Sequence, residues 1–250
     1  MFLAGAIAPY SYQEQSRDEV FAGASRRRLF GTDGLGRDRF SRTLYGGRLS
    51  LAGAPAAALL SGAIALGLGL AGGLGGKRRE RAISAAADLC LSLPWIFALL
   101  AARAALPLNA APEVTAALTF AMLGALGWAG PCRMILAAVK RHRASEFALL
   151  AEANGCARWR IAAVQIAPNL LPLVWAQFLV TVPAFLLAEA NLGLLGLGAP
   201  EPLPSLGGML RELENVSAIP SHPLALAPAA VLFLLVSSFH LLVSADEYSV

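Results

Sequence analysis

Charged residues are scarce in this 250-residue sequence. Asp, Glu, Lys and Arg make up 14% of it, whereas hydrophobic residues make up 57% and the mean hydropathy is +0.61. A soluble domain normally carries about a quarter charged residues, so an ordinary soluble fold is excluded. Several apolar stretches exceed the roughly 20 residues that a helix needs to cross a bilayer, and no two-residue alternation typical of a membrane barrel is present. The sequence therefore predicts a multi-pass membrane protein built from helices.

Cysteine and histidine are also sparse. The three cysteines, Cys90, Cys132 and Cys156, are odd in number and unpaired in spacing, which argues against a disulfide framework. The three histidines are scattered without ligand spacing, so we expect no metal site and no cofactor. No nucleophile and base can be named that would converge, so we expect no enzymatic activity. The net charge of +4 is modest and predicts no nucleic-acid partner.

Five apolar stretches are long enough to be complete spans. They cover approximately the residues 49–76, 83–106, 114–136, 168–196 and 223–245. The apolar residues 1–9 are too short to span a membrane, and we expect them to be the end of a further span whose beginning is missing. The predicted fold class is all-α, a polytopic membrane helical bundle with five complete spans plus the end of a sixth.

Two dense basic clusters set the expected orientation of these spans. The first is KRRER at 77–81, between the first two complete spans, and the second is KRHR at 140–143, after the third. Lys and Arg concentrate in cytoplasmic loops, so both clusters are expected in the cytoplasm. The Arg-rich loop at 17–48 would then lie outside, against the same rule, although the rule weakens for long translocated segments.

A polar interruption at 145–169 separates two of the apolar stretches. It predicts two short helices hinged at Gly155, because glycine most easily adopts the left-handed turn that ends a helix. We expect Ser145 to accept a hydrogen bond from the first amides of the first helix, and Glu146 suits the positive end of its dipole. Pro168 is expected to end the second helix.

The first of these two short helices has one narrow apolar face. Phe147, Leu150 and Ala151 follow the i, i+3, i+4 spacing of a helix. A segment so small cannot bury this face alone, so it needs a surface on which to dock. An amphipathic loop lying on lipid is the other interpretation of the same pattern.

Two acidic residues fall within the predicted spans. Ionisable groups at membrane depth are costly and usually face protein or water. Asp88 lies close to the cytoplasmic end of its span and is expected at the interface, whereas Glu189 lies farther inside. We therefore expect a structural or pathway role for Glu189.

Four stretches of the chain resemble the motifs of one family. Residues 29–51 read LFGTDGLGRDRFSRTLYGGRLSL, residues 88–100 DLCLSLPWIFALL, residues 127–135 GWAGPCRMI and residues 186–210 LLAEANLGLLGLGAPEPLPSLGGML. In this order they resemble the inner-membrane permease subunits of binding-protein-dependent ABC importers. The resemblance is to the second permease type of the dipeptide, oligopeptide and nickel branch, with an apparently truncated N-terminal helix.

The resemblance implies a type I ABC importer permease fold and a role in ATP-driven uptake of di- or oligopeptides or a related small solute. The implied location is the bacterial plasma (inner) membrane. The implied partners are a second homologous permease subunit, two cytoplasmic ATPase subunits, an extracytoplasmic solute-binding protein and membrane lipid. In this interpretation residues 1–48 are the remnant of the first span and an extramembrane loop, and residues 49–245 form the transmembrane permease domain.

The resemblance also implies a role for the polar interruption, as part of a cytoplasmic coupling loop at 137–168. In such a loop a short helix docks into a groove on an ATPase. The residues expected to take part are Ser145, Glu146, Phe147, Leu149, Leu150, Ala151, Glu152 and Gly155. Leu149 and Leu150 stand where the family has Glu and Ala, so the alternative is a degenerate or truncated homologue that inserts but does not transport.

Overall fold

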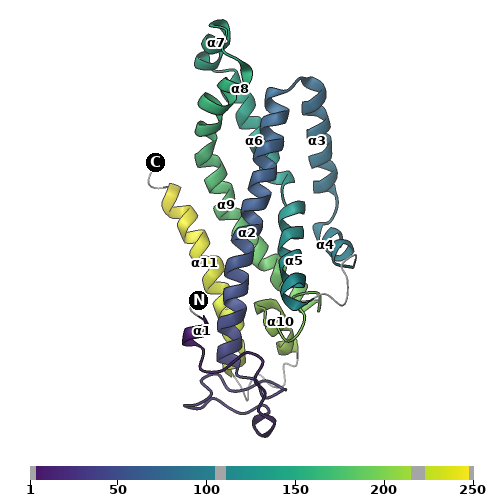
Figure 1. Cartoon of the computed structure of the whole chain (residues 1–250), viewed down its shortest axis with the longest axis vertical. Helices are drawn as coiled ribbons and strands as arrows, with labels where there is room; N and C mark the ends of the chain where they lie inside the picture. Colours follow the sequence, from purple (N-terminus) through teal and green to yellow (C-terminus); the bar gives the residue numbers. More distant parts are fainter. Residues whose placement is uncertain (1–3, 105–110, 215–222, 248–250) are drawn as a thin grey trace. The chain divides into compact units, whose positions relative to one another are not determined.

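The structure is a computed structural model that describes residues 4–104, 111–214 and 223–247. Within these ranges it contains helices and no strand, and one isolated β-bridge joins Thr32 and Asp38. The longer helices, labelled in Figure 1, are α2 (Arg39–Leu74), α3 (Lys77–Ser92), α4 (Trp95–Ala104), α5 (Pro112–Leu126), α6 (Ala129–Arg143), α7 (Glu146–Ala153), α9 (Ala167–Leu194) and α11 (Ala227–Glu247). The shorter elements are α1 (Ala4–Ile7), η1 (Arg17–Glu19), α8 (Arg158–Arg160), η2 (Ile161–Ile166), α10 (Leu206–Arg211), η3 (Glu212–Glu214) and η5 (Pro223–Leu226).

Four helical stretches in the described ranges are long and apolar enough to cross a membrane. They are Arg39–Leu74, Pro112–Arg143, Ile161–Leu194 and Pro223–Ser244. Each overlaps one of the predicted spans, and the all-helical class is confirmed. The first begins at Arg39 rather than near residue 49, because the polar end of the preceding loop continues the same helix.

The predicted span at 83–106 is divided into two helices, so five complete spans are not confirmed. α3 ends at Ser92, Leu93 has an extended backbone (φ −75°, ψ 128°), and α4 begins at Trp95. Pro94 explains the break, because a proline pushes the preceding residue out of the helical region and has no N–H to bond backward. With 16 and 10 residues, neither helix reaches the length of a span alone.

Pro168 does not end a helix, and the prediction that it does is wrong. The π-helical turn η2 runs directly into α9, and Pro168 occupies the first turn of α9. The N–H of Ala167 bonds to the carbonyl of Ala162, five residues back. This wider turn shifts the hydrogen-bond register ahead of Pro168, so the missing N–H of the proline is accommodated without breaking the helix.

The chain forms two compact units. The first unit comprises Met1–Pro55, Arg103–Phe120 and Val182–Val250, and the second comprises Ala56–Ala102 and Ala121–Thr181. Helices α2, α5 and α9 contribute residues to both. The predicted boundary at residue 48 does not coincide with either unit and stays a prediction.

In the second unit, α2, α6, α7, η2 and α9 share one apolar core. Small residues permit close packing there: a Cβ added at Gly69 would lie 2.6 Å from Ile135 Cγ2, and one added at Gly73 would lie 2.4 Å from Val139 Cγ1. The fully buried members of this core are Ala65, Cys132, Ile135, Ala138, Val139, Ala148, Ala151, Ile161, Ile166 and Leu170. The core therefore joins the short helix α7 to the long helices.

In the first unit, the buried apolar residues come mainly from α9 and α10. They include Phe185, Leu186, Leu192, Leu206 and Met209. The stretch at 197–204 is non-helical, and α10 follows it. Parts of two predicted features, the stub at 1–9 and the end of the span at 83–106, fall on residues outside the described ranges.

Candidate functional site

Ser145 lies at the junction of α6 and α7. Its backbone carbonyl accepts hydrogen bonds from the N–H groups of Ala148 and Leu149, both at 3.1 Å. Its hydroxyl does not cap α7, contrary to the prediction, and donates instead to the carbonyl of His142 in the last turn of α6. The last carbonyls of a helix lack partners within the helix, which explains why the hydroxyl turns back toward α6. Glu146 lies in the first turn of α7, where the helix dipole favours its charge.

One face of the helix α7 packs against the rest of the second unit, and its other face is exposed. Ala148 and Ala151 are 3% and 8% exposed and pack into the core of the second unit. Phe147, Leu149 and Leu150 are 41%, 53% and 63% exposed. Large apolar side chains gathered on a short extramembrane helix are costly in water, so this face is suited to docking on a partner.

Gly155 ends α7 in the conformation that the sequence predicts. Its φ is +77°, in the left-handed region. The N–H of Gly155 bonds to the carbonyl of Glu152 at 3.1 Å, and the N–H of Cys156 bonds to the carbonyl of Ala151 at 3.0 Å. These two bonds form a Schellman motif, in which Asn154 is the C-cap and the glycine follows it. The predicted turn at Gly155 is therefore present, but the second helix is not short, because α8, η2 and α9 follow one another without a break.

The junction before α7 is tied to the end of α2 by a cation. Arg143 Nη1 donates to the carbonyls of Gly73 and Leu74 at 3.4 and 3.5 Å. These carbonyls lie at the negative end of the α2 dipole, which attracts a guanidinium. Arg143 and Glu152 also border a cavity of about 20 Å³ beneath α7. The position of α7 is thus fixed by packing on one side and by Arg143 at its base.

Asp88 lies on α3 with its side chain largely exposed. Its Oδ1 is 3.1 Å from Arg133 Nη1 on α6, and both side chains are more than half exposed. A second bridge between the same helices joins Lys140 Nζ to Glu80 Oε1 at 2.6 Å. The hydrogen bond from Lys140 lowers the pKa of Glu80. Exposed bridges of this kind contribute little to stability, so they align α3 with α6 rather than stabilise them strongly.

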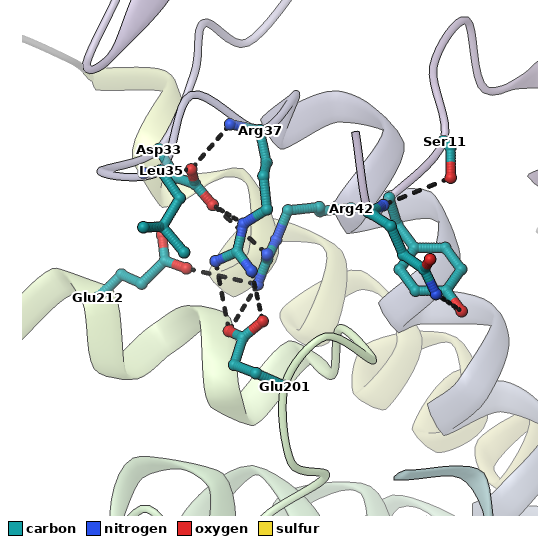
Figure 2. Close-up of polar contacts among 9 residues, drawn as sticks. Ser11, Asp33, Leu35, Arg37, Arg42, Glu201 and Glu212 are labelled. Carbon is teal, nitrogen blue, oxygen red and sulfur yellow. Dashed lines mark hydrogen bonds and ion pairs between the residues drawn. The ribbon is translucent and has the colours of Figure 1, made fainter. Parts of the chain in front are cut away.

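An ion network organises the loop before α2 in the first unit, with Asp33, Arg37 and Arg42 buried and Glu201 exposed (Figure 2). Asp33 Oδ1 accepts from the N–H of Arg37 at 2.9 Å, and Arg37 Nε donates to Asp33 Oδ2 at 2.7 Å. Arg37 also donates to Glu201, and Arg42 Nη2 donates to Glu201 Oε1 at 3.1 Å. Arg42 Nη2 also lies 3.6 Å from Glu212 Oε1. The network therefore joins the segment before α2 to the non-helical stretch before α10 and to the end of α10.

The charged groups in this network shift one another's pKa values. Burial opposes the ionisation of Glu201, but hydrogen bonds from Arg37 and Arg42 outweigh it and lower the pKa of this carboxyl. Burial also opposes the charge of Arg37, yet its bonds to Glu201 and Asp33 raise its pKa. At Glu212 burial dominates and raises the pKa, although Arg42 acts in the opposite direction. Glu201 therefore carries its negative charge more firmly than Glu212.

Glu189 is buried in α9 at 2% exposure. Ser50 Oγ donates to its Oε2 at 3.2 Å. In the described part of the chain, Glu189 Oε1 has no hydrogen-bond partner. The backbones are close here, because a Cβ added at Gly193 would lie 2.3 Å from the carbonyl carbon of Gly207. Glu189 thus lies at the contact of α2, α9 and the start of α10, and it accepts a hydrogen bond from the hydroxyl of Ser50.

Comparison with known sequences decides the family. The sequence profile of the family described as "Binding-protein-dependent transport system inner membrane component" matches residues 63–245, well over half of the chain. The chain belongs to this family of permeases. It is therefore a non-enzymatic transport subunit and a multi-pass protein of the bacterial inner membrane.

Individual relatives of the permease carry peptide-transport names. The Dipeptide transport system permease protein DppC of Alkalihalophilus pseudofirmus is 34% identical over 242 residues, which cover 96% of this chain and 76% of the relative. The protein of the same name from Haemophilus influenzae is 29% identical, covering 96% and 81%. The Oligopeptide transport system permease protein OppC of Bacillus subtilis is 29% identical, covering 84% and 67%. These matches support the dipeptide and oligopeptide branch and do not favour a degenerate homologue.

The structure brings some of the predicted residues together and separates others. The eight residues of the predicted coupling site occupy one short segment of the permease, whereas Asp88 and Glu189 lie in different units. The ion network of Asp33, Arg37 and Glu201 was not predicted as a site. Its signal was present in the sequence, because the resemblance at 29–51 and 186–210 includes these charged residues.

Proposed function

We propose that this permease is half of the membrane pathway of an ATP-driven importer for di- or oligopeptides. The names of its relatives support the substrate class. Its proposed partners are a second homologous permease subunit, two cytoplasmic ATPase subunits and an extracytoplasmic solute-binding protein. ATP-driven closure of the ATPases would move the spans between inward-facing and outward-facing states.

The observation that carries this proposal is the construction of α7. Its inner face is anchored by Ala148 and Ala151, its C-terminal turn is closed at Gly155, and its outer face presents Phe147 and Leu150. A short helix that is fixed to the transmembrane core and apolar on its free side can transmit a push from a partner into the long helices. Contact with lipid would use the same apolar side chains, but it would not require α7 to be packed rigidly against the transmembrane core.

The burial of α7 supports a narrower set of residues for the proposed contact with the ATPase. Ala151 is buried in the chain itself, so the contact surface moves to Phe147, Leu149 and Leu150. Leu149, where the family has Glu, adds apolar area to this surface. We therefore propose an apolar contact at this position in the matching ATPase groove, in place of a charged one.

The proposed topology keeps five complete spans, with the C-terminus inside. In it α3 and α4 cross the membrane together, and α7 and Gly155 lie in the cytoplasm. The basic residues 77–81 and 140–143 support this orientation. The ion network around Arg37 and Glu201 then lies on the outer side, where a solute-binding protein would approach.

Replacing Phe147 by Asp tests the coupling proposal. We expect the variant to reach the membrane in normal amounts but to lose co-purification with its ATPase subunits and ATP-driven uptake of labelled dipeptide. The physical reason is that a charge would have to be desolvated in an apolar groove. Phe147→Leu should retain both activities.

A matched control separates docking from general damage. Val20 is 46% exposed, close to the 41% of Phe147, and lies in the other unit. Val20→Asp introduces the same charge and should leave ATPase co-purification unchanged. Normal ATPase binding and uptake by Phe147→Asp would show that α7 is not the coupling helix.

A further inference from the structure

The second unit holds a large cavity to which the helix α7 contributes no lining residue. Its volume is about 530 Å³, within the roughly 300–1,000 Å³ of typical ligand sites. Its lining residues include Leu70, Ala71 and Leu74 at the end of α2, and Trp159, Ala163 and Ala167 around η2. It is separate from the small cavity beneath α7, with which it shares only Leu74.

One cation borders this apolar cavity. Arg79, in the first turn of α3, lines it, and in the described part of the chain Arg79 takes part in no salt bridge. The side chain packs over Gly75, where an added Cβ would lie 3.1 Å from Arg79 Cδ and 2.6 Å from the carbonyl of Ala71. Gly75 thus leaves room for the arginine stem at the cavity edge, and the guanidinium is available to an anion.

The surroundings of the cavity are positively charged. Lys77, Arg78 and Arg81 are exposed on the same turn of α3. The one acid in this turn, Glu80, is paired with Lys140 at 2.6 Å. The charge near the cavity is therefore complementary to an anionic group and not to a cationic one.

The cavity lies where two candidate spans reach their ends. Leu74 ends the candidate span Arg39–Leu74, and the candidate span Ile161–Leu194 begins two residues after Trp159. Trp159 is 71% exposed. Tryptophan and basic side chains concentrate at the membrane–water interface, so the cavity is at the level of lipid headgroups.

We propose that this cavity binds an anionic phospholipid, with acyl chain along the apolar wall of α2 and η2 and phosphate on Arg79. A guanidinium matches phosphate with two parallel hydrogen bonds, and basic pockets between membrane helices bind anionic headgroups. Free phosphate would leave the apolar wall in water, and a neutral lipid would leave Arg79 without an anion. The proposal rests on the membrane location of the chain and not on its coupling to an ATPase.

Quenching of tryptophan fluorescence by brominated lipid tests this proposal. The full-length protein is reconstituted in vesicles that contain brominated phosphatidylglycerol or, at the same fraction, brominated phosphatidylcholine. We expect stronger quenching by phosphatidylglycerol, and Trp159→Phe should remove this difference. Arg79→Gln should weaken the preference for phosphatidylglycerol about tenfold, as expected for the loss of one charge-assisted contact.

Two further variants make the test specific. Arg78→Gln removes the same charge from the same turn but not from the cavity lining, and it should keep the preference. Ala163→Leu fills the apolar wall without changing any charge, and it should reduce quenching by phosphatidylglycerol. Equal losses in Arg78→Gln and Arg79→Gln, or equal quenching by the two lipids, would overturn the proposal. Competition by inorganic phosphate would do so too, because it would assign the site to free phosphate.

Discussion

Gly155 is the residue whose backbone conformation most directly determines the end of α7. At φ +77° a side chain with a branched Cβ is strained by about 1–2 kcal/mol. We expect Gly155→Val to insert into the membrane but to lose ATP-driven uptake, because the Schellman turn that holds α7 would open. Membrane abundance and uptake in vesicles with the cognate ATPases measure the two effects.

Asparagine provides the control at the same position. It tolerates the left-handed region better than other residues that have a side chain, so Gly155→Asn should keep most of the uptake. If Val and Asn variants were equally impaired, the size of the side chain rather than the backbone conformation would be responsible. Unchanged uptake in Gly155→Val would exclude a role for the turn.

Glu201 gives the ion network a predictable pH dependence. Its pKa in the folded protein is lowered from the ordinary value of 4.5, so its contribution to stability is present above that value and is lost as the pH falls through the lowered pKa. The carboxylate is 60% exposed, so we expect a contribution of about 1 kcal/mol or less. Thermal unfolding of the detergent-solubilised protein between neutral and acidic pH should show a wild-type advantage over Glu201→Gln that disappears in acid.

Glu212 should behave in the opposite sense. Burial raises its pKa, so its contribution is present below the ordinary value and is lost as the pH rises through the raised pKa. Glu212→Gln should therefore match the wild type in acid and equal or exceed its stability at neutral pH. A pH profile of Glu212→Gln that matched that of Glu201→Gln would contradict these assignments.

At the scale of the element, α7 separates a face that holds it in the chain from a face that is free. Ala151→Leu places three extra heavy atoms in a packed core, so we expect the free energy of unfolding to fall by about 1–3 kcal/mol. Hydrogen exchange of the α7 amides in the isolated permease should become faster. The measurement needs no ATPase and therefore reports only how α7 packs on the core of the second unit.

Leu150→Ala is the companion variant on the free face. Leu150 is 63% exposed, so its truncation should leave the unfolding free energy of the isolated permease nearly unchanged and should weaken ATPase binding. Equal destabilisation by both variants would mean that α7 does not have two distinct faces. Unchanged hydrogen exchange in Ala151→Leu would mean that Ala151 does not hold α7 against the core of the second unit.

At the scale of the whole molecule, the sequence predicts those features that depend on local patterns. Apolar runs locate four candidate spans, and the preference of glycine for positive φ locates the turn at Gly155. The break at Pro94 was missed because hydropathy does not register backbone hydrogen bonding. The hydroxyl of Ser145 could either cap α7 or donate to the last turn of α6, and only the position of α6 decides between these two hydrogen bonds.

The ion network shows why the remaining contacts could not be predicted. Arg37 and Glu201 are 164 residues apart in the sequence, and no periodicity links them. A side-chain pair of this kind forms only once the fold has brought the two segments together. The resemblance to a family locates the charged residues but does not say which of them meet.

Cysteine labelling tests whether α3 and α4 together cross the membrane. The two helices supply jointly the roughly 20 residues that a span needs, although Pro94 divides them. In a variant with Cys90, Cys132 and Cys156 replaced by alanine, single cysteines are introduced at three exposed positions: Arg78, Glu113 and Arg141.

A maleimide that does not cross membranes is then applied to intact, right-side-out vesicles. We expect labelling of Glu113→Cys from outside and labelling of Arg78→Cys and Arg141→Cys only after permeabilisation, because the basic turns favour the cytoplasm. Labelling of Arg78→Cys and Glu113→Cys from the same side, with Arg141→Cys on the other side, would mean that α3 and α4 enter and leave on one face. The permease would then have four complete spans, and with α3 and α4 no longer a span, α7 would need a new basis for its assignment to the cytoplasm.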